Sequence, residues 1–220
     1  MKTLTKYLNE KLVINKDYND PYTCVPTSWK ELRKIIEDRY NKLGPGTKQN
    51  PIDFNDVDVS NIDSFYNKHY EIGIFEKTKF EYIDILYWNV SNIKDMGYMF
   101  FGCEQLKSIG DISNWNVLRV ENMRYMFQGC AQLKSVDLSN WNVSNVENMD
   151  SMFHGCVDLT SVGDLSNWNV SNAENISSMF CKCKQLKSVG NLSNWNVSNV
   201  EYMFDMFYKS GITNIPDWYR

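Results

Sequence analysis

The chain has 220 residues, of which 43% are hydrophobic and 23% charged, so its composition is that of a folded globular protein rather than a disordered one. Lys and Arg number 23 against 27 Asp and Glu, and the formal charge of −4 argues against a basic nucleic-acid-binding face. No apolar run approaches the roughly 18 residues that a membrane span requires. We therefore expect neither nucleic acid nor membrane as a partner.

The first twenty residues lack the apolar core of a secretory signal. The six cysteines would suit disulfides in an exported protein, but without a signal we expect them to remain thiols. The sequence thus favours a cytoplasmic protein, with the cell surface as the alternative location.

A helix is expected over about residues 29–43. Ser28 and Glu31 form a capping-box pattern before it, and the stretch Gly44-Pro45-Gly46 ends it. Its apolar positions fall on one helical face, and they are Leu32, Ile35, Ile36, Tyr40 and Leu43. We assign residues 1–50 to a small N-terminal α/β cap.

Residues 51–87 are interpreted as a degenerate first repeat with an insertion. The stretch from Val59 to Phe65 is similar to the one that begins at Val90, but it lacks the Trp and Met of the later units. The insertion carries the apolar residues Tyr70, Ile72, Ile74, Phe75 and Phe80.

From residue 88 onward the chain is an internal repeat. Trp88, Trp115, Trp141, Trp168 and Trp195 are spaced by 26 or 27 residues. Cysteine recurs with the same spacing at positions 103, 130, 156 and 183. A unit of 26–27 residues lies within the range of leucine-rich repeats. We therefore expect residues 88–220 to be leucine-rich repeats.

Each unit is expected to contain a short strand, a turn and a short helix. In the third unit the strand precedes Trp141, and the helix, or a 3₁₀ turn, runs from Val146 to Phe153 and ends at Gly155. The Trp, Met, Phe, Cys and Leu positions would stack into buried columns, and Ile212, Ile215, Pro216 and Trp218 would close the stack as a C-terminal half-turn. The predicted fold class is an α/β solenoid.

The stretch from Asp137 to Val146, continued by Met152, Phe153, Cys156 and Leu159, resembles the BspA-like leucine-rich-repeat proteins. Their repeat domain, of unknown function, is shared with mycoplasma surface lipoproteins. The resemblance implies a right-handed solenoid and, for exported members, adhesion or host contact. The chain departs from the family pattern at Asn142, where the family carries Asp, and in lacking an export signal.

Residues for catalysis or metal binding are sparse. His154 falls at a position that varies between units and is interpreted as a surface residue, and His69 has no recognisable acid or nucleophile partner. No phosphate-binding loop, nucleophile elbow or zinc-type pair is present. Cys181 and Cys183 are separated by one residue, with no second pair to complete a metal site, and Cys181 is expected at an outer position. We expect no enzyme activity, no cofactor and no metal.

A candidate binding surface emerges from positions that vary between units. These positions lie on or just after the predicted short helix. The aromatic and arginine residues among them are expected to be exposed anchors for a protein partner. The predicted protein-binding residues are Tyr98, Phe101, Arg124, Tyr125, Phe204 and Tyr208. Two alternatives remain: neutral drift on a solvated face, or packing of Tyr98 on Tyr125. A row of Lys107, Lys134 and Lys187 is interpreted as solubilising.

The function expected from these features is a non-enzymatic protein–protein interaction scaffold, for example a small inhibitor or effector of bacterial or mobile-element origin. Its partner would be another protein, and the chain itself would be a monomer or a weak oligomer. The alternative is a bacterial surface adhesion or host-contact module.

Overall fold

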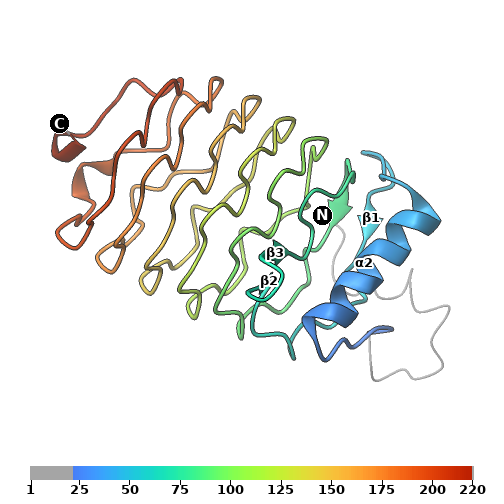
Figure 1. Ribbon diagram of the computed structural model, residues 1–220. Coiled ribbons are helices and arrows are strands. Elements are labelled where there is room, and N and C mark those ends of the chain that lie inside the picture. The colour runs from blue at the N-terminus through green and yellow to red at the C-terminus, as the bar shows by residue number, and fades with distance from the viewer. Residues whose placement is uncertain (1–21, 220) are drawn as a thin grey trace.

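The computed structural model describes residues 22–219, so the first 21 residues of the expected N-terminal cap lie outside it. The chain forms a row of stacked turns that runs from a helix at one end to the C-terminal residues at the other (Figure 1). Its elements are helix α2 (Trp29–Leu43), strands β1 (Ile52–Asp53), β2 (Tyr66–Asn67), β3 (Ile72–Gly73) and β4 (Ile83–Asp84), and the 3₁₀ helices η2 (Leu192–Asn194) and η3 (Asp217–Tyr219).

Helix α2 occupies the range expected from its capping pattern. The Ser28 hydroxyl accepts a hydrogen bond from the Glu31 N–H, and the Gly44 N–H donates to the Tyr40 carbonyl oxygen. The Glu31 carboxylate accepts from the N–H and hydroxyl of Thr27, at 2.8 and 3.0 Å, and so acts one residue earlier than a capping box predicts. The helix buries Leu32 and Ile36 against the first turns and covers that end of the stack.

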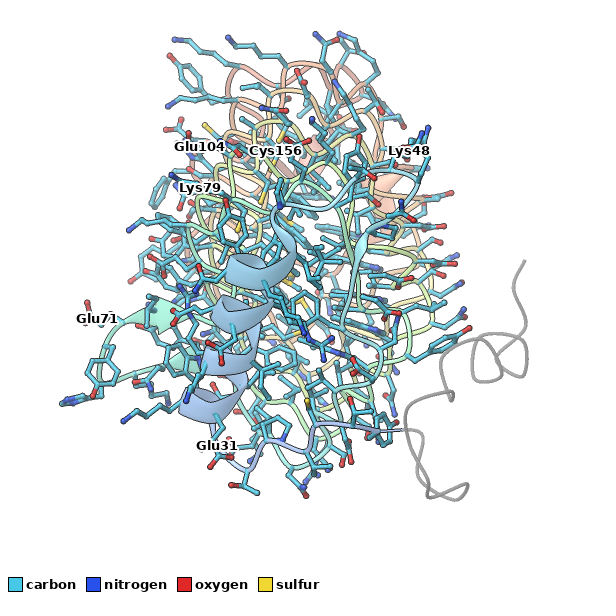
Figure 2. The ribbon with its side chains drawn as sticks, turned by 90° about the vertical axis from the view of Figure 1, so that its right-hand side faces the viewer. Glu31, Lys48, Glu71, Lys79, Glu104 and Cys156 are labelled. Carbon is cyan, nitrogen blue, oxygen red and sulfur yellow. The ribbon has the colours of Figure 1, made fainter. Side chains whose placement is uncertain are left out.

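The insertion after the first turn is a β-hairpin. Strands β2 and β3 pair antiparallel, with Tyr66 opposite Gly73. Gly73 is required there because a Cβ atom at this position would lie 2.0 Å from the Tyr98 carbonyl oxygen. The hairpin is therefore pressed against the backbone of the following turn, and Glu71 at its tip projects away from the stack (Figure 2).

Neighbouring turns are joined by parallel β-bridges between equivalent positions. One series of bridges runs the length of the stack, through Ser64, Asp95, Asn122, Asn148, Asn175 and Tyr202. From Asp95 onward, each bridge joins the same position of two successive sequence repeats. Isolated bridges and hydrogen bonds, rather than regular strands, connect the turns over the described residues beyond 88.

The prediction of a short helix in each unit is wrong. In the third unit the N–H groups of Met152 and Cys156 donate to the carbonyl oxygens three residues earlier, in two successive β-turns. Ser151 and Gly155 have positive φ angles of 55° and 75°, as the third residue of a type II turn requires. Alternate N–H groups from Met149 to Gly155 instead donate to carbonyl oxygens of the next turn, at 2.8–2.9 Å. In a helix these N–H groups would donate to carbonyl oxygens of the same segment. Because they donate to the next turn instead, the segment forms β-turns and no helix.

The buried tryptophan column is confirmed. The five indoles are at most 5% exposed. Neighbouring rings lie nearly parallel, with 6.3 Å between the Trp115 and Trp141 centroids. Most of the indole N–H groups donate to a backbone carbonyl of the preceding turn, as Trp141 does to Ile112 at 3.0 Å. A parallel phenylalanine column runs from Phe75 to Phe207 with centroids 5.2–6.1 Å apart.

The C-terminal segment covers part of the last turn. Trp218 extends the tryptophan column, with its centroid 6.2 Å from that of Trp195, and its indole N–H donates to the Leu192 carbonyl oxygen at 2.8 Å. Tyr219 packs edge-on against Phe207. The Trp and Phe columns thus end beneath aromatic residues.

Candidate functional site

The cysteine column is part of the core and not a reactive site. Each of its thiols donates a hydrogen bond to the backbone carbonyl oxygen of a phenylalanine in the preceding turn, at 3.0–3.2 Å. Burial raises the pKa of Cys103 to about 11 and that of Cys183 to about 12. All six cysteines are free. Cys181, expected at an outer position, is in fact only 3% exposed, and burial raises the pKa of its thiol too.

The turn backbone places four of the six predicted binding residues on the surface beside the hairpin. Tyr98 and Tyr125 both have a φ of 58°, at the position where the later turns carry Ser151, Ser178 and Asp205 with similar angles. Because this position repeats with the stack, tyrosines of neighbouring turns are brought within contact of each other. The centroids of Tyr98 and Tyr125 are 4.8 Å apart.

A cluster of aromatic rings forms around these two tyrosines, and we call Tyr66, Tyr98, Phe101, Arg124 and Tyr125 the aromatic cluster. Tyr66, from strand β2, stacks on Tyr98 with 5.1 Å between centroids. The Arg124 guanidinium lies 5.5 Å from the Tyr66 centroid and 5.3 Å from that of Tyr98, a cation–π arrangement with both rings. The hairpin and two repeat turns thus meet in one surface.

Full exposure of the predicted anchors is wrong for four of the six. Four of them are half-buried because their side chains pack on one another in the cluster: Tyr98, Phe101, Arg124 and Tyr125. The packing of Tyr98 on Tyr125, which the sequence left open as the alternative to exposed anchors, is observed. Phe204 and Tyr208 are exposed, at 65% and 49%, but they lie in the last turn, apart from the cluster. The structure divides the predicted stripe into two surfaces.

Tyr66 is the member of the cluster that the sequence analysis missed. Aligning Val59 with Val90 places Tyr66 in register with Gly97 and Arg124, the variable position next to Tyr98. That register was available from the sequence. The hairpin that turns the Tyr66 ring onto Tyr98 was not, because the insertion interrupts the repeat.

Tyr98 and Tyr125 stay neutral at physiological pH. Burial raises the pKa of Tyr98, and burial together with a hydrogen bond to Asp150 raises that of Tyr125 to about 12. The Arg124 guanidinium donates at 3.4 Å to the Tyr66 hydroxyl, but its Nε atom is buried without a partner. The cluster therefore offers neutral rings, hydroxyls and one cation to a partner.

An open groove of about 880 Å³ lies beside the aromatic cluster. Its lining includes Tyr66, Lys68 and Glu71 of the hairpin together with Arg124 and other residues of the repeat turns. Carboxylates outnumber cations among its lining residues, so the groove is acidic. It continues along a row of stacked glutamates, which we call the Glu row and which comprises Glu121, Glu147, Glu174 and Glu201.

Members of the lysine row are engaged within the chain. Lys107 contacts Glu81 at 2.6 Å, and Lys134 contacts Asp158 at 2.7 Å. The Lys187 ammonium donates to the Lys184 carbonyl oxygen at 3.4 Å. This row thus supports the surface of the stack and presents no unpaired basic patch.

The two histidines lie in different parts of the stack, His69 on the hairpin and His154 in the third repeat unit. His69 is exposed and packs edge-on against Tyr70 on the hairpin. His154 is half-buried, and burial, together with the charge of Lys182, lowers its pKa. Among residues 22–219 no three His, Cys, Asp or Glu side chains are grouped so that they could hold a metal ion.

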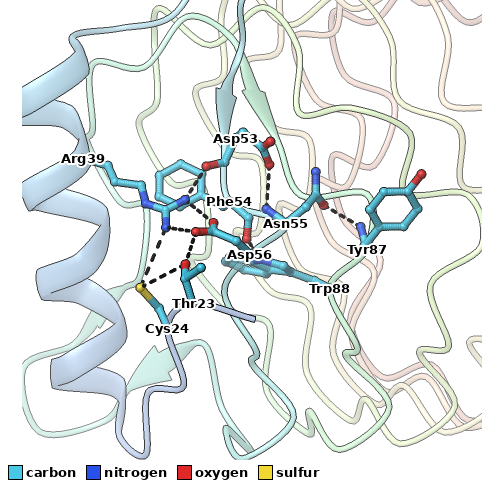
Figure 3. A network of polar contacts seen from close by, with 9 residues as sticks. All are labelled: Thr23, Cys24, Arg39, Asp53, Phe54, Asn55, Asp56, Tyr87 and Trp88. Carbon is cyan, nitrogen blue, oxygen red and sulfur yellow. Dashed lines mark hydrogen bonds and ion pairs between the residues drawn. The ribbon is translucent and has the colours of Figure 1, made fainter. Parts of the chain in front are cut away.

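A polar network joins helix α2 to the first turn (Figure 3). The Arg39 guanidinium donates to both carboxylate oxygens of Asp56, at 2.6 and 2.9 Å, and to the Asp53 carbonyl oxygen. The Thr23 hydroxyl donates to the same carboxylate. Burial by itself would raise the pKa of Asp56, but the bonds from Arg39 and Thr23 outweigh it and lower that pKa. The network is structural and lies away from the aromatic cluster.

No helix in the described part of the chain is long and apolar enough to cross a bilayer. A family model described as "Mycoplasma protein of unknown function, DUF285" matches residues 47–156, 72–188 and 135–218. A leucine-rich repeat protein from Eubacterium ventriosum, known from a 2.50 Å crystal structure, is 20% identical with a TM-score of 0.41. The match covers 64% of this chain and 34% of that one, so the chain spans about a third of its length. No curated protein matches the chain.

Proposed function

The chain belongs to the family of Mycoplasma proteins of unknown function DUF285, and we propose that it is a non-enzymatic scaffold that binds another protein through the aromatic cluster. The finer fold assignment, a right-handed leucine-rich-repeat solenoid with a separate N-terminal cap, is part of the same proposal. A stack held together by hydrogen bonds between all its turns supplies a rigid contact surface, which limits the entropy lost on binding.

The observation that carries the proposal is the composition of the aromatic cluster. Three tyrosines, a phenylalanine and an arginine share one surface beside an acidic groove. Tyr and Arg are the residues most often found as energetic anchors of protein interfaces. The rings are already packed in place, so little side-chain entropy would be lost when a partner covers them.

The repeat itself supplies the substitutions that test the proposal. Tyr98→Ser and Tyr125→Ser introduce the residue that the later turns carry at the same backbone position, with the same positive φ angle. Affinity capture with the full chain should recover a near-stoichiometric partner. We expect each substitution to weaken the affinity for that partner by about tenfold or more.

A matched control is Lys187→Ser on the lysine row, which should leave binding unchanged. If the control loses binding and the Tyr98 and Tyr125 variants keep it, the interface lies on the face of the lysine row and not at the aromatic cluster. An activity towards a small substrate that depends on His69 or His154 would overturn the non-enzymatic assignment.

A cytoplasmic location belongs to the proposal as well. It is tested by adding protease to intact cells, since an intracellular scaffold is protected until the cells are lysed. Cleavage on intact cells would instead favour the alternative of a surface adhesion or host-contact module.

A further inference from the structure

The last turn of the stack, residues 196–210, leaves part of its backbone without hydrogen-bond partners. In the turn before it, the N–H groups of Ile176, Ser178, Phe180 and Lys182 donate to carbonyl oxygens of the last turn at 2.8–2.9 Å. The equivalent donors of the last turn are the N–H groups of Met203, Asp205, Phe207 and Lys209. None of these four finds an acceptor among residues 22–219.

The core beneath this part of the turn is also incompletely covered. Val143, Val146 and Met149 of the third unit are at most 1% exposed. Their counterparts Val197, Val200 and Met203 are only partly buried. Trp218 and Tyr219 cover the neighbouring Trp195 and Phe207 and do not close this half of the turn. We call residues 197–209 the open edge.

The open edge carries aromatic residues where a solvated edge would carry polar ones. Tyr202 stands at a position held by Asp95, Asn122, Asn148 and Asn175 in the other turns, and it is 51% exposed. Phe204, 65% exposed, stands at the position of Asp150 and Ser177. Terminal repeats need a polar outer face for solubility, and exposed edges are commonly protected by charge. The aromatic edge therefore indicates a surface that is covered in use.

A second copy of the chain is a poor match for the open edge. At the opposite end of the stack, the Arg33 guanidinium donates to the carbonyl oxygens of Ile74 and Glu76, at 2.8 and 3.4 Å. Helix α2 thus covers two of the carbonyl groups to which a preceding turn would donate. Two open edges placed against each other would oppose N–H donors to N–H donors.

We propose that the open edge binds one segment of a partner protein, which adds a further turn to the stack. The segment runs parallel to the last turn, and its backbone carbonyl oxygens accept from the N–H groups of Met203, Asp205, Phe207 and Lys209. Apolar side chains of the segment cover Val200 and Met203. This inference concerns a different surface from the aromatic cluster and does not depend on the proposed function.

Charge selects the first residue of the bound segment. Within the Glu row, the N–H of Glu201 donates to the Glu174 carbonyl oxygen at 2.8 Å, so successive glutamates lie directly over one another. The segment places one residue over Glu201 in the same way. Because like charges on adjacent strands repel and opposite charges attract, a Lys or Arg fits this position better than an acidic residue.

The chain's own repeat provides a probe for this edge. A synthetic peptide of residues 142–156 carrying Cys156→Ser reproduces a segment that covers the turn before it in the intact chain. A second peptide adds Glu147→Lys, because residue 147 covers Glu121 in the stack as the bound residue would cover Glu201. Both peptides are labelled and titrated against the full chain.

We expect saturable binding of both peptides, with the Lys form about threefold tighter. Bound peptide should slow amide hydrogen exchange at the four open-edge N–H groups by about tenfold or more. The double variant Tyr202→Lys with Phe204→Lys should weaken binding by about tenfold or more. These side chains are exposed, so thermal unfolding should show an intact fold. The Lys187→Ser variant is the control and should bind the peptides as the unmodified chain does.

Several results would overturn the proposal. The proposal is excluded if neither of the two peptides binds. It is also excluded if the bound peptide protects amides only outside residues 197–209, or if the double variant binds the peptides as tightly as the unmodified chain. Sedimentation of the chain alone is the last measurement. If the unmodified chain forms a dimer and the double variant is a monomer, the open edge binds a second copy of the chain and not a partner protein.

Discussion

The Cys156 thiol donates a hydrogen bond of 3.0 Å to the backbone carbonyl oxygen of Phe127, one turn earlier in the stack. The same relationship joins Cys103 to Phe75 and Cys183 to Phe153. Each thiol thus connects the cysteine column to the backbone of the phenylalanine column, which explains a small, weakly polar residue at a fully buried position.

Replacing this thiol should destabilise the stack. For Cys156→Ala we expect the free energy of unfolding to fall by about 1–3 kcal/mol, because a buried hydrogen bond is lost and a small cavity is left. Urea unfolding followed by tryptophan fluorescence measures it. The neighbouring half-buried Val157→Ala is the control, with a smaller expected loss. Equal losses in the two variants would show that the hydrogen bond contributes nothing.

Alkaline pH should weaken the fold through the same column. Burial raises the pKa of all four column thiols, to about 11 for Cys103 and about 12 for Cys183. The pKa of a thiol in the unfolded chain is about 8.5. The contribution of the buried thiols to the free energy of unfolding is therefore complete below that pH and is lost as the pH rises towards the pKa values of the folded chain. We expect the melting temperature to fall between about pH 8.5 and 10. A variant with alanine at all four positions should lose less over that interval.

Arg33 should be needed to close the N-terminal end of the stack. Its guanidinium donates to the carbonyl oxygens of Gly73 and Ile74, at 3.3 and 2.8 Å. Arg33→Met keeps the aliphatic stem but removes the donor to the Ile74 carbonyl oxygen, whereas the Gly73 carbonyl oxygen still accepts from the Glu76 N–H. We therefore expect a loss of about 2 kcal/mol in the free energy of unfolding. The exposed Lys34→Met is the control and should change it by about 0.5 kcal/mol or less. Chemical denaturation of both variants measures the two losses, and equal losses would contradict the prediction.

Gly73 should tolerate no side chain. Gly73→Ala would place a Cβ atom 2.0 Å from the Tyr98 carbonyl oxygen, so the hairpin must move off the turn. We expect a loss of about 3 kcal/mol and weaker partner binding, since Tyr66 moves with the hairpin. Gly129→Ala is the control: its nearest contact is an ordinary 3.5 Å, and its positive φ should cost about 1 kcal/mol. A Gly73→Ala protein as stable as the control would refute close packing of the hairpin.

Acid should loosen helix α2 from the first turn. The pKa of Asp56 is lowered in the folded chain by Arg39 and Thr23 against the opposing effect of burial. Its stabilisation is therefore complete above the unfolded value of about 3.9 and is lost as pH falls through the lower folded value. We expect Asp56→Asn to destabilise the chain at neutral pH and to flatten its stability below about pH 4. An unchanged acid profile in this variant would assign acid sensitivity to other carboxylates.

Much of the stack was predictable from the sequence because the repeat period belongs to the sequence itself. Trp141, Phe153 and Cys156 recur at one spacing, and residues that recur at one spacing in a stack must lie over one another. Helix α2 was equally predictable, since Ser28, its apolar stripe and Gly44 act locally.

The conformation of each turn was decided only by the tertiary structure. The apolar spacing from Val146 to Phe153 suits a short helix as well as two β-turns. Only a neighbouring turn at hydrogen-bonding distance draws the N–H of Ser151 to the carbonyl oxygen of Ser177 instead of to its own turn. The local sequence pattern cannot show that an N–H group will donate to a carbonyl oxygen 26 residues further along the chain.

The surface was determined in the same divided way. The sequence by itself identified the variable positions, because packing leaves them unconstrained from unit to unit. Whether an aromatic ring there is packed or exposed depends on what lies beside it. Tyr98 packs between Tyr66 and Tyr125, while Phe204 has no further turn above it among residues 22–219 and is exposed. Burial is a property of neighbours in space, and the tertiary structure alone supplies them.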